Sequence, residues 1–130
     1  MATEVKGRLH VRRRLASFGY AAEGWWHVLR TQPNAWIHAA ISIIVFVLAF
    51  WLDLSPLEWA ILILTTMAVW MAEFINTSLE AVVDLMMPEI HPLAKAAKDV
   101  AAAAVLVGAI GAVVIGLLIM GPPLWQRLFG

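Results

Sequence analysis

Three carboxylates lie on one face of a predicted helix and could support chemistry together. At 100° per residue, Glu80 and Asp84 project within about 20° of Glu73. Asn76 and Thr77 lie within about 60° of the same direction, and apolar side chains fill most of the remaining circumference. Ionisable groups at membrane depth are costly, so their default interpretation is a functional site.

Glu73 and Glu80 lie two helical turns apart and could divide two tasks. One carboxylate could accept a proton from a hydroxyl nucleophile, and the other could hold Mg²⁺, which prefers oxygen ligands. Burial makes a carboxylate a stronger base, so the deeper Glu73 is the better candidate base. Asn76 could donate and accept hydrogen bonds between the two. Lys98 could contact phosphates, and Asp99 could orient a lysine or a metal ion.

These groups suit phosphoryl transfer, which needs positioning, a divalent ion and positive charge near the phosphoryl oxygens. Two other uses of the carboxylates stay open. An ion or proton pathway would need polar residues along a whole span, and the segments 35–52 and 100–120 offer almost none. A structural or regulatory trimer without catalysis would use the carboxylates as a polar interface and would tolerate the loss of a base.

The composition restricts the class of protein. The chain has 130 residues, enough for the single domain 1–130, and is 62% hydrophobic with a mean hydropathy of +0.83. These values indicate an all-α integral membrane protein. The formal net charge of zero argues against nucleic acid as a partner, and the absence of cysteine excludes disulfides, thiol nucleophiles and cysteine metal sites.

The elements that must position the carboxylates can be read in order. Residues 1–30 form an N-terminal segment whose apolar residues recur every three or four positions from Val11, which predicts an amphipathic helix at the membrane interface. Three transmembrane helices follow, at about 35–52, 56–87 and 93–120. Pro33 suits a first helical turn, and Gly121-Pro122-Pro123 predicts the end of the last helix.

The second span is longer than the bilayer requires. Its 32 predicted residues would extend roughly 48 Å, against a hydrocarbon core of about 30 Å. The carboxylates therefore approach the membrane surface, where a lipid headgroup and a soluble cosubstrate can meet. In the third span, small residues at spacings of three and four predict close helix packing: Ala94, Ala97, Ala101, Ala104, Gly108 and Gly111.

The basic residues predict the topology. Eight of the nine Lys and Arg residues precede the first span or flank the connection near residues 88–92, and the exception is Arg127. The positive-inside rule places the N-terminus and the carboxylates on the cytoplasmic side of the plasma (inner) membrane. Among the four histidines no pair has metal-ligand spacing on one helix, and His38 is predicted to be a satisfied histidine near the interface.

Several motifs together resemble a known family. The sequence reads AEFINTSLEAVVD at 72–84 and PEIHPLAKAAKDVAAAAVLV at 88–107, after GYxxEG at 19–24 and NAWIH at 34–38. In these motifs the chain resembles the small prokaryotic diacylglycerol kinases and their undecaprenol kinase relatives, over roughly residues 12–120. The resemblance implies a membrane lipid kinase that uses ATP and Mg²⁺.

The resemblance assigns roles to residues of the second and third spans. Glu73 matches the catalytic base, which deprotonates the lipid hydroxyl for direct attack on the γ-phosphate of ATP. Glu80 matches a magnesium ligand that also bears on the nucleotide. Asn76, Lys98 and Asp99 match polar active-site residues, the last two near the phosphates.

The resemblance also implies nucleotide contacts from the rest of the chain. Arg13 and Tyr20 match nucleotide-contacting residues of the N-terminal helix, and Glu89 and His91 lie in the loop beside them. The family works as a homotrimer whose sites are shared between neighbouring subunits, with lipid entering from the bilayer.

One departure from the family concerns the metal. Gln32 stands where many members have a second metal-binding glutamate, and an uncharged amide oxygen should bind Mg²⁺ more weakly. The loop at 88–95 and the pair Asp84-Leu85 look more like the undecaprenol kinase branch. Undecaprenol is therefore the expected lipid, and diacylglycerol is the alternative.

Overall fold

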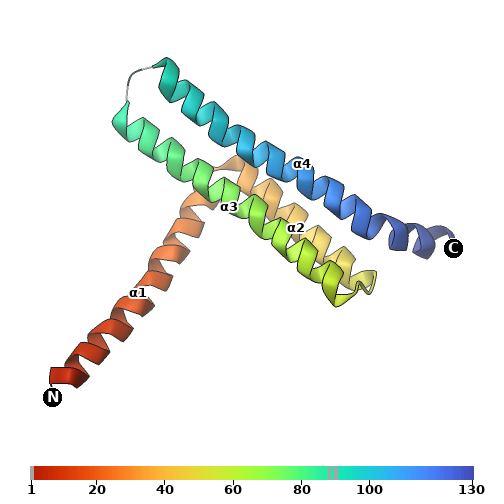
Figure 1. Ribbon diagram of the computed structural model, residues 1–130, viewed down its shortest axis with the longest axis horizontal. Helices are drawn as coiled ribbons and strands as arrows, with labels where there is room; N and C mark the ends of the chain where they lie inside the picture. The colour runs from red at the N-terminus through yellow and green to blue at the C-terminus, as the bar shows by residue number, and fades with distance from the viewer. Residues whose placement is uncertain (1, 88, 90) are drawn as a thin grey trace. The chain divides into compact units, whose positions relative to one another are not determined.

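The protein is helical throughout the part of the chain that the structure describes. The computed structural model describes residues 2–87, 89 and 91–130, with side chains from residue 16 onward in these ranges. It contains four helices, α1 (Ala2–Thr31), α2 (Pro33–Trp51), α3 (Pro56–Met86) and α4 (Pro92–Phe129) (Figure 1). The last three are long and apolar enough to cross a membrane. The prediction of an all-α protein with three such helices is confirmed.

The chain divides into two units, Met1–Pro33 and Asn34–Gly130. The first consists of α1, which begins at Ala2, well before the amphipathic segment predicted from Val11. In its described part the guanidinium of Arg30 lies 4.8 Å from the centre of the Trp26 ring. The placement of this helix in the membrane interface stays a prediction.

The second unit contains α2, α3 and α4, and a tight turn joins the first two of these. Asp53 adopts the left-handed backbone conformation, with φ of 57°. Ser55 then caps α3: its side chain accepts the backbone N–H of Glu58, and the Glu58 carboxylate accepts the backbone N–H of Ser55 at 2.7 Å. Pro56 occupies the first turn of the helix, where a missing N–H costs nothing. The predicted start of the second span at residue 56 is confirmed.

The predicted end of the last helix is wrong. Gly121-Pro122-Pro123 does not stop α4, which continues to Phe129 with both prolines inside it. Each proline keeps a helical φ but removes one N–H donor and crowds the carbonyl four residues before it, so the helix continues at a local cost. Contacts also hold the extension: Leu124 packs on apolar side chains at the α2–α3 turn, and the guanidinium of Arg127 lies 5.2 Å from the Trp51 ring centre.

The core of this unit lies at the α2–α3 turn and along the α3–α4 contact. At the turn, Ala49, Leu52, Leu54 and Leu62 form a buried cluster. Along α4 the buried face contains Ala101 and Val105. Ala94 and Gly108 lie partly buried on it, whereas Ala97 and Ala104 are exposed. Gly111 is also partly buried, so four of the six predicted members are at least partly buried and the predicted seam of small residues is confirmed in part.

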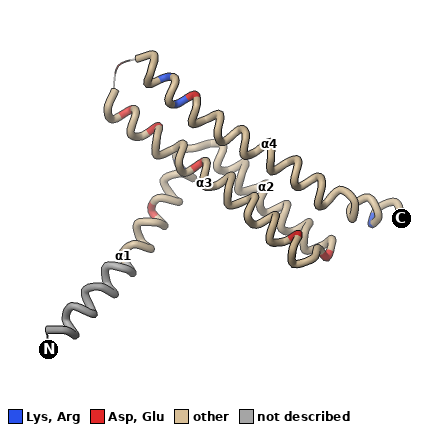
Figure 2. Tube along the Cα trace, in the orientation of Figure 1, with Lys and Arg blue, Asp and Glu red and all other residues tan. Residues whose placement is uncertain are grey.

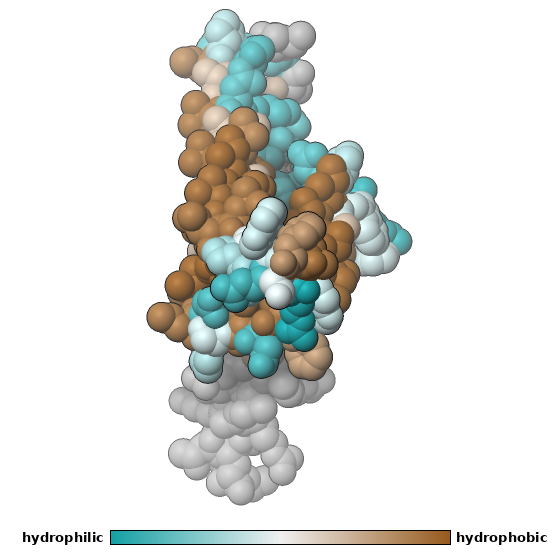
Figure 3. All heavy atoms as spheres, turned by 90° about the vertical axis from the view of Figure 1, so that its right-hand side faces the viewer, coloured by the Kyte–Doolittle hydropathy of each residue, from teal (hydrophilic) through white to brown (hydrophobic). Residues whose placement is uncertain are grey.

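The outer surface of the unit suits a lipid environment. α2 carries no charged residue and the charges of α4 lie near its two ends, as Figure 2 shows. Apolar side chains cover a broad continuous area in the space-filling view (Figure 3). Many of them are large and well exposed, such as Phe50 and Leu118. Exposed apolar surface of this extent on long helices is typical of transmembrane segments.

The close contact between α3 and α4 predicts that two glycines of α4 differ in how well they tolerate a larger side chain. A Cβ at Gly108 would lie 3.9 Å from Cγ2 of Val69, in ordinary contact, whereas a Cβ at Gly111 would meet nothing within 4 Å. We expect Gly108→Ala to preserve the free energy of unfolding or to raise it by up to about 1 kcal/mol. Gly108→Leu should lower it by about 1–3 kcal/mol, because the larger side chain pushes into Val69.

The measurement is denaturant unfolding in detergent micelles, with Gly111→Leu as the matched control on the same helix. The control should unfold like the wild-type protein. Equal losses for Gly108→Leu and Gly111→Leu would contradict the packing described above.

Candidate active site

The carboxylate face of α3 passes from a buried to an exposed environment. Glu73 lies about 26 Å along the helix from Pro56, close to the thickness of a hydrocarbon core. Its side chain is buried, with only 1% of the residue exposed. Glu80 is half-buried and Asp84 is exposed. The prediction that Glu73 is the deeper of the two candidate catalytic carboxylates is therefore confirmed, although its role as a base stays a prediction.

Hydrogen bonds organise the residues between the carboxylates. The amide Nδ2 of Asn76 donates to Oε1 of Glu80 at 3.1 Å. The hydroxyl of Thr77 donates to the backbone carbonyl of Glu73 at 2.9 Å, so its polar atom is satisfied within the helix. Oε1 of Glu73 and Oδ1 of Asn76 are buried and have no hydrogen-bond partner. Because buried polar atoms are nearly always paired, these two oxygens indicate a place for a ligand.

A histidine on α2 faces the deep carboxylate. Nε2 of His38 lies 3.7 Å from Oε2 of Glu73, and the two side chains are 13% and 2% exposed. This Nε2 is buried and lacks a hydrogen-bond partner, so the prediction that His38 is a satisfied interfacial histidine is wrong. A sequence signal was present: His38 and Ser42 are the two polar residues of the span 35–52, and a spacing of four places them on one helix face.

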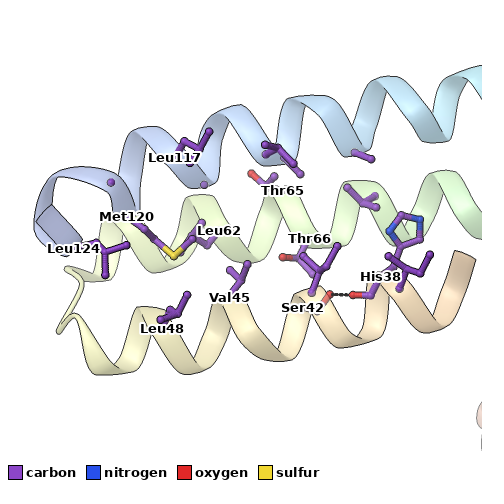
Figure 4. A pocket seen from close by; sticks show the side chains of 18 of the residues that line it. His38, Ser42, Val45, Leu48, Leu62, Thr65, Thr66, Leu117, Met120 and Leu124 are labelled. Carbon is purple, nitrogen blue, oxygen red and sulfur yellow. Dashed lines mark hydrogen bonds between the residues drawn. The ribbon is translucent and has the colours of Figure 1, made fainter. Parts of the chain in front are cut away.

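An apolar cavity begins at this histidine. It has a volume of about 440 Å³ and is lined by residues of α2, α3 and α4. Figure 4 shows His38 at one end and Leu124 at the other, with Ser42, Thr65 and Thr66 as the polar side chains between them. Its lining is otherwise apolar, which is typical of sites for apolar ligands.

A second group of polar side chains lies at the end of α3 and the start of α4, close to the connection between the two helices. Nζ of Lys98 donates to both carboxylate oxygens of Asp84, at 2.9 and 3.2 Å, and lies close enough to Glu80 for their charges to interact. Asp99 instead pairs with Lys95 one turn away. The structure thus brings Lys98 to the carboxylate face. The group that orients Lys98 is Asp84. Asp99 pairs with another lysine, and its predicted contact with a metal ion stays a prediction.

The remaining predicted residues are only partly placed. Glu89 is exposed. His91 caps the start of α4, where its Nδ1 accepts the backbone N–H of Leu93 at 3.2 Å. Tyr20 is exposed on α1 and Gln32 follows that helix, both in the Met1–Pro33 unit. The side chain of Arg13 lies outside the described residues. The nucleotide and metal contacts of these residues stay predictions.

The described side chains contain no group of three or more His, Asp and Glu residues that could hold a metal ion without other ligands. The arrangement instead offers a buried carboxylate that faces His38 at the end of an apolar cavity, and a half-buried Glu80 near Lys98 of α4. These features define a helical membrane protein with a polar site at one end of an apolar cavity.

The comparisons identify the family. A profile of the prokaryotic diacylglycerol kinase family matches residues 19–120. The chain is 43% identical over 117 residues to the undecaprenol kinase of Bacillus subtilis, covering 90% of this chain and 95% of that protein. It is 44% identical over 111 residues to the diacylglycerol kinase of Synechocystis, covering 85% of this chain and 63% of that protein.

The diacylglycerol kinase of Escherichia coli strain K12 is 34% identical over 115 residues, covering 83% of this chain and 88% of that protein. The chain belongs to the prokaryotic diacylglycerol kinase family. The resemblance predicted from its motifs is confirmed.

The hydrogen bond from Asn76 to Glu80 predicts an order of stabilities. Asn76→Ala removes the donor and should lower the free energy of unfolding by about 1–3 kcal/mol. Asn76→Asp should lower it further at neutral pH, because two carboxylates would then face each other. Lowering the pH should shrink the gap between the two variants, since a proton shared between the carboxylates restores a donor.

Unfolding of purified protein in detergent at pH 5 and pH 8 tests this order. The Ser78→Ala variant changes an exposed hydroxyl one turn away and should behave like wild type. An aspartate variant as stable as the alanine variant at both pH values would contradict the geometry.

Proposed function

We propose that this protein is an ATP-dependent lipid kinase that transfers the γ-phosphate to the hydroxyl of undecaprenol. The observation that carries this proposal is the buried Glu73, which faces His38 at the end of an apolar cavity. Glu73 lies on the helix that bears the Asn76–Glu80 pair, in a chain of this family. The relative that matches over 90% of the chain at 43% identity is an undecaprenol kinase, which supports this lipid.

The residues of the site can perform the transfer directly. Glu73 accepts the proton as the lipid O–H bond breaks, and the freed electron pair forms the new bond to the γ-phosphorus. The bond from that phosphorus to the bridging oxygen breaks, and its electron pair leaves with ADP. Lys98 supplies positive charge for the phosphates, and its contact with Asp84 keeps it near Glu80.

The donor set of the site suits Mg²⁺. This ion usually binds through one or two carboxylates and completes its shell with substrate phosphates and water. Glu80 offers such a carboxylate, oriented by Asn76, and Gln32 is the proposed second, weaker ligand. When bound, the ion neutralises charge on the phosphate oxygens. A site of this kind needs no cluster of three protein ligands.

The proposed nucleotide site takes residues from several parts of the chain. They are Arg13, Tyr20, Glu80, Glu89, His91, Lys98 and Asp99. The exposure of Tyr20 and Glu89 leaves these side chains accessible to a soluble ligand. His91 uses Nδ1 for the cap of α4, which leaves Nε2 to interact with phosphate.

The proposed setting is the plasma (inner) membrane, with the N-terminus and the site in the cytoplasm. The distribution of Lys and Arg supports this orientation. We propose that the N-terminal helix lies in the membrane interface and that the chain works as a homotrimer, as the family resemblance implies. Glu73 and Asn76 are already buried within a single chain, so burial of these groups is not the reason for the trimer.

Diacylglycerol is the alternative lipid, because relatives at 44% and 34% identity are diacylglycerol kinases. Both lipids present a hydroxyl on a long apolar body, and the cavity lining does not distinguish them. A non-catalytic membrane trimer is the alternative of another class, and it would make the buried carboxylate beside His38 unnecessary.

Phosphate transfer from γ-labelled ATP tests the proposal. The purified protein in mixed micelles with Mg²⁺ receives undecaprenol and diacylglycerol in parallel. We expect labelling of both lipids to require Mg²⁺ and to be faster for undecaprenol.

The controls are samples from which Mg²⁺ has been removed with EDTA and samples to which Mg²⁺ or Ca²⁺ is then added back. Faster labelling of diacylglycerol would overturn the lipid assignment but not the chemistry. Labelling of neither lipid by a folded, assembled protein would overturn the kinase proposal.

A further inference from the structure

His38 and Glu73 form a buried pair, and the proposed mechanism uses only one of the two residues. The mechanism uses the carboxylate of Glu73 and assigns nothing to the histidine. The side chains are 13% and 2% exposed, and Nε2 of His38 faces Oε2 of Glu73 at 3.7 Å. The other carboxylate oxygen, Oε1, has no hydrogen-bond partner. The two oxygens of Glu73 therefore have different surroundings.

A buried carboxylate is stable as an anion only with a partner that donates to it or opposes its charge. Among the described side chains, His38 is the one group able to carry positive charge within 4 Å of Glu73. His38 is thus the group available to hold Glu73 ionised and able to accept a proton.

Other contacts orient the imidazole toward α3. The rings of His38 and Trp70 meet edge to face, with centres 6.3 Å apart and an angle of 65°. The indole N–H of Trp70 donates to Oγ of Ser42 at 3.3 Å, and this hydroxyl donates to the carbonyl of His38 at 2.7 Å. This set of contacts joins α2 to α3 one turn before Glu73. It leaves Nε2 of His38 as the imidazole atom that lies 3.7 Å from Oε2 of Glu73.

We propose that His38 is a positioning residue for Glu73: Nε2 donates to Oε2 and leaves Oε1 to take the proton of the acceptor hydroxyl. This inference rests on the proposed kinase function. The present separation of 3.7 Å exceeds a hydrogen bond, and such contacts commonly shorten when substrate binds. The proton stays on Glu73 during the transfer, so His38 changes no covalent bond.

Two amide substitutions test the reach of the donor. In His38→Gln the side-chain nitrogen can occupy the place of Nε2, whereas the shorter His38→Asn can only reach the place of Nδ1. We expect His38→Asn to lower kcat by about 10- to 100-fold, the range typical for loss of a partner that orients a reactive group. His38→Gln should stay within about threefold of wild type. KM for ATP and for the lipid should change little in both variants, because the lost interaction stabilises the transition state and not the bound substrates.

Wild-type turnover is measured first, and unfolding midpoints establish that both variants are folded. Ser78→Ala, on the exposed side of α3, is the control with unchanged turnover. A histidine that only fills space would give equal kcat for the two amides, whether lowered or unchanged, and either result would overturn the role of His38 alone. Absence of wild-type turnover would instead overturn the proposed function and this inference with it.

Discussion

The structure depends on the burial of one carboxylate among apolar helices. Glu73 is 1% exposed, and taking an unpartnered anion out of water costs several kcal/mol. The surrounding residues reduce that cost by different means. His38 faces one oxygen of the carboxylate, and the hydroxyl of Thr77 satisfies the backbone at the same turn of α3. The other oxygen has no partner. A group held in this way is costly for folding alone, and the proposed role of Glu73 as a base gives that cost a function.

The length of α3 and its contact with α4 determine where Glu73 lies relative to the other polar side chains. α3 has 31 residues, about 46 Å, which exceeds a hydrocarbon core of about 30 Å, and Glu80 lies about 10 Å further along it than Glu73. α4 approaches α3 closely where Ala101 and Gly108 face it. That contact also brings the N-terminal part of α4 to the C-terminal part of α3, where Lys98 donates to Asp84. The contact between α3 and α4 thus places a buried carboxylate and, further along α3, a group of charged side chains near one another.

Much of this arrangement could be predicted because it depends on local patterns. The spacing of Glu73, Asn76 and Glu80 on one helix face follows from helical geometry, and the Ser55–Pro56 start follows from capping chemistry. The partner of Glu73 could not be found in this way, because it lies on another helix and depends on how α2 packs against α3. The same holds for Lys98, whose partner is Asp84 across the α3–α4 contact rather than a neighbour on α4. The predicted end of the last helix at Gly121-Pro122-Pro123 is wrong for a different reason. Leu124 packs on the apolar cluster at the α2–α3 turn, and this tertiary contact outweighs the local tendency of the prolines to end a helix.

The most direct test of the account is the turnover of Glu73→Gln beside wild type, with assembly and ATP affinity measured on the same samples. Gln keeps the size and hydrogen-bonding capacity of the side chain but cannot accept a proton. The account predicts intact assembly, nearly unchanged ATP affinity and a loss of kcat of at least about 100-fold, the usual scale for general-base catalysis. Wild-type turnover in this variant would contradict the assignment of Glu73 as the base. It would leave the buried carboxylate with a structural role.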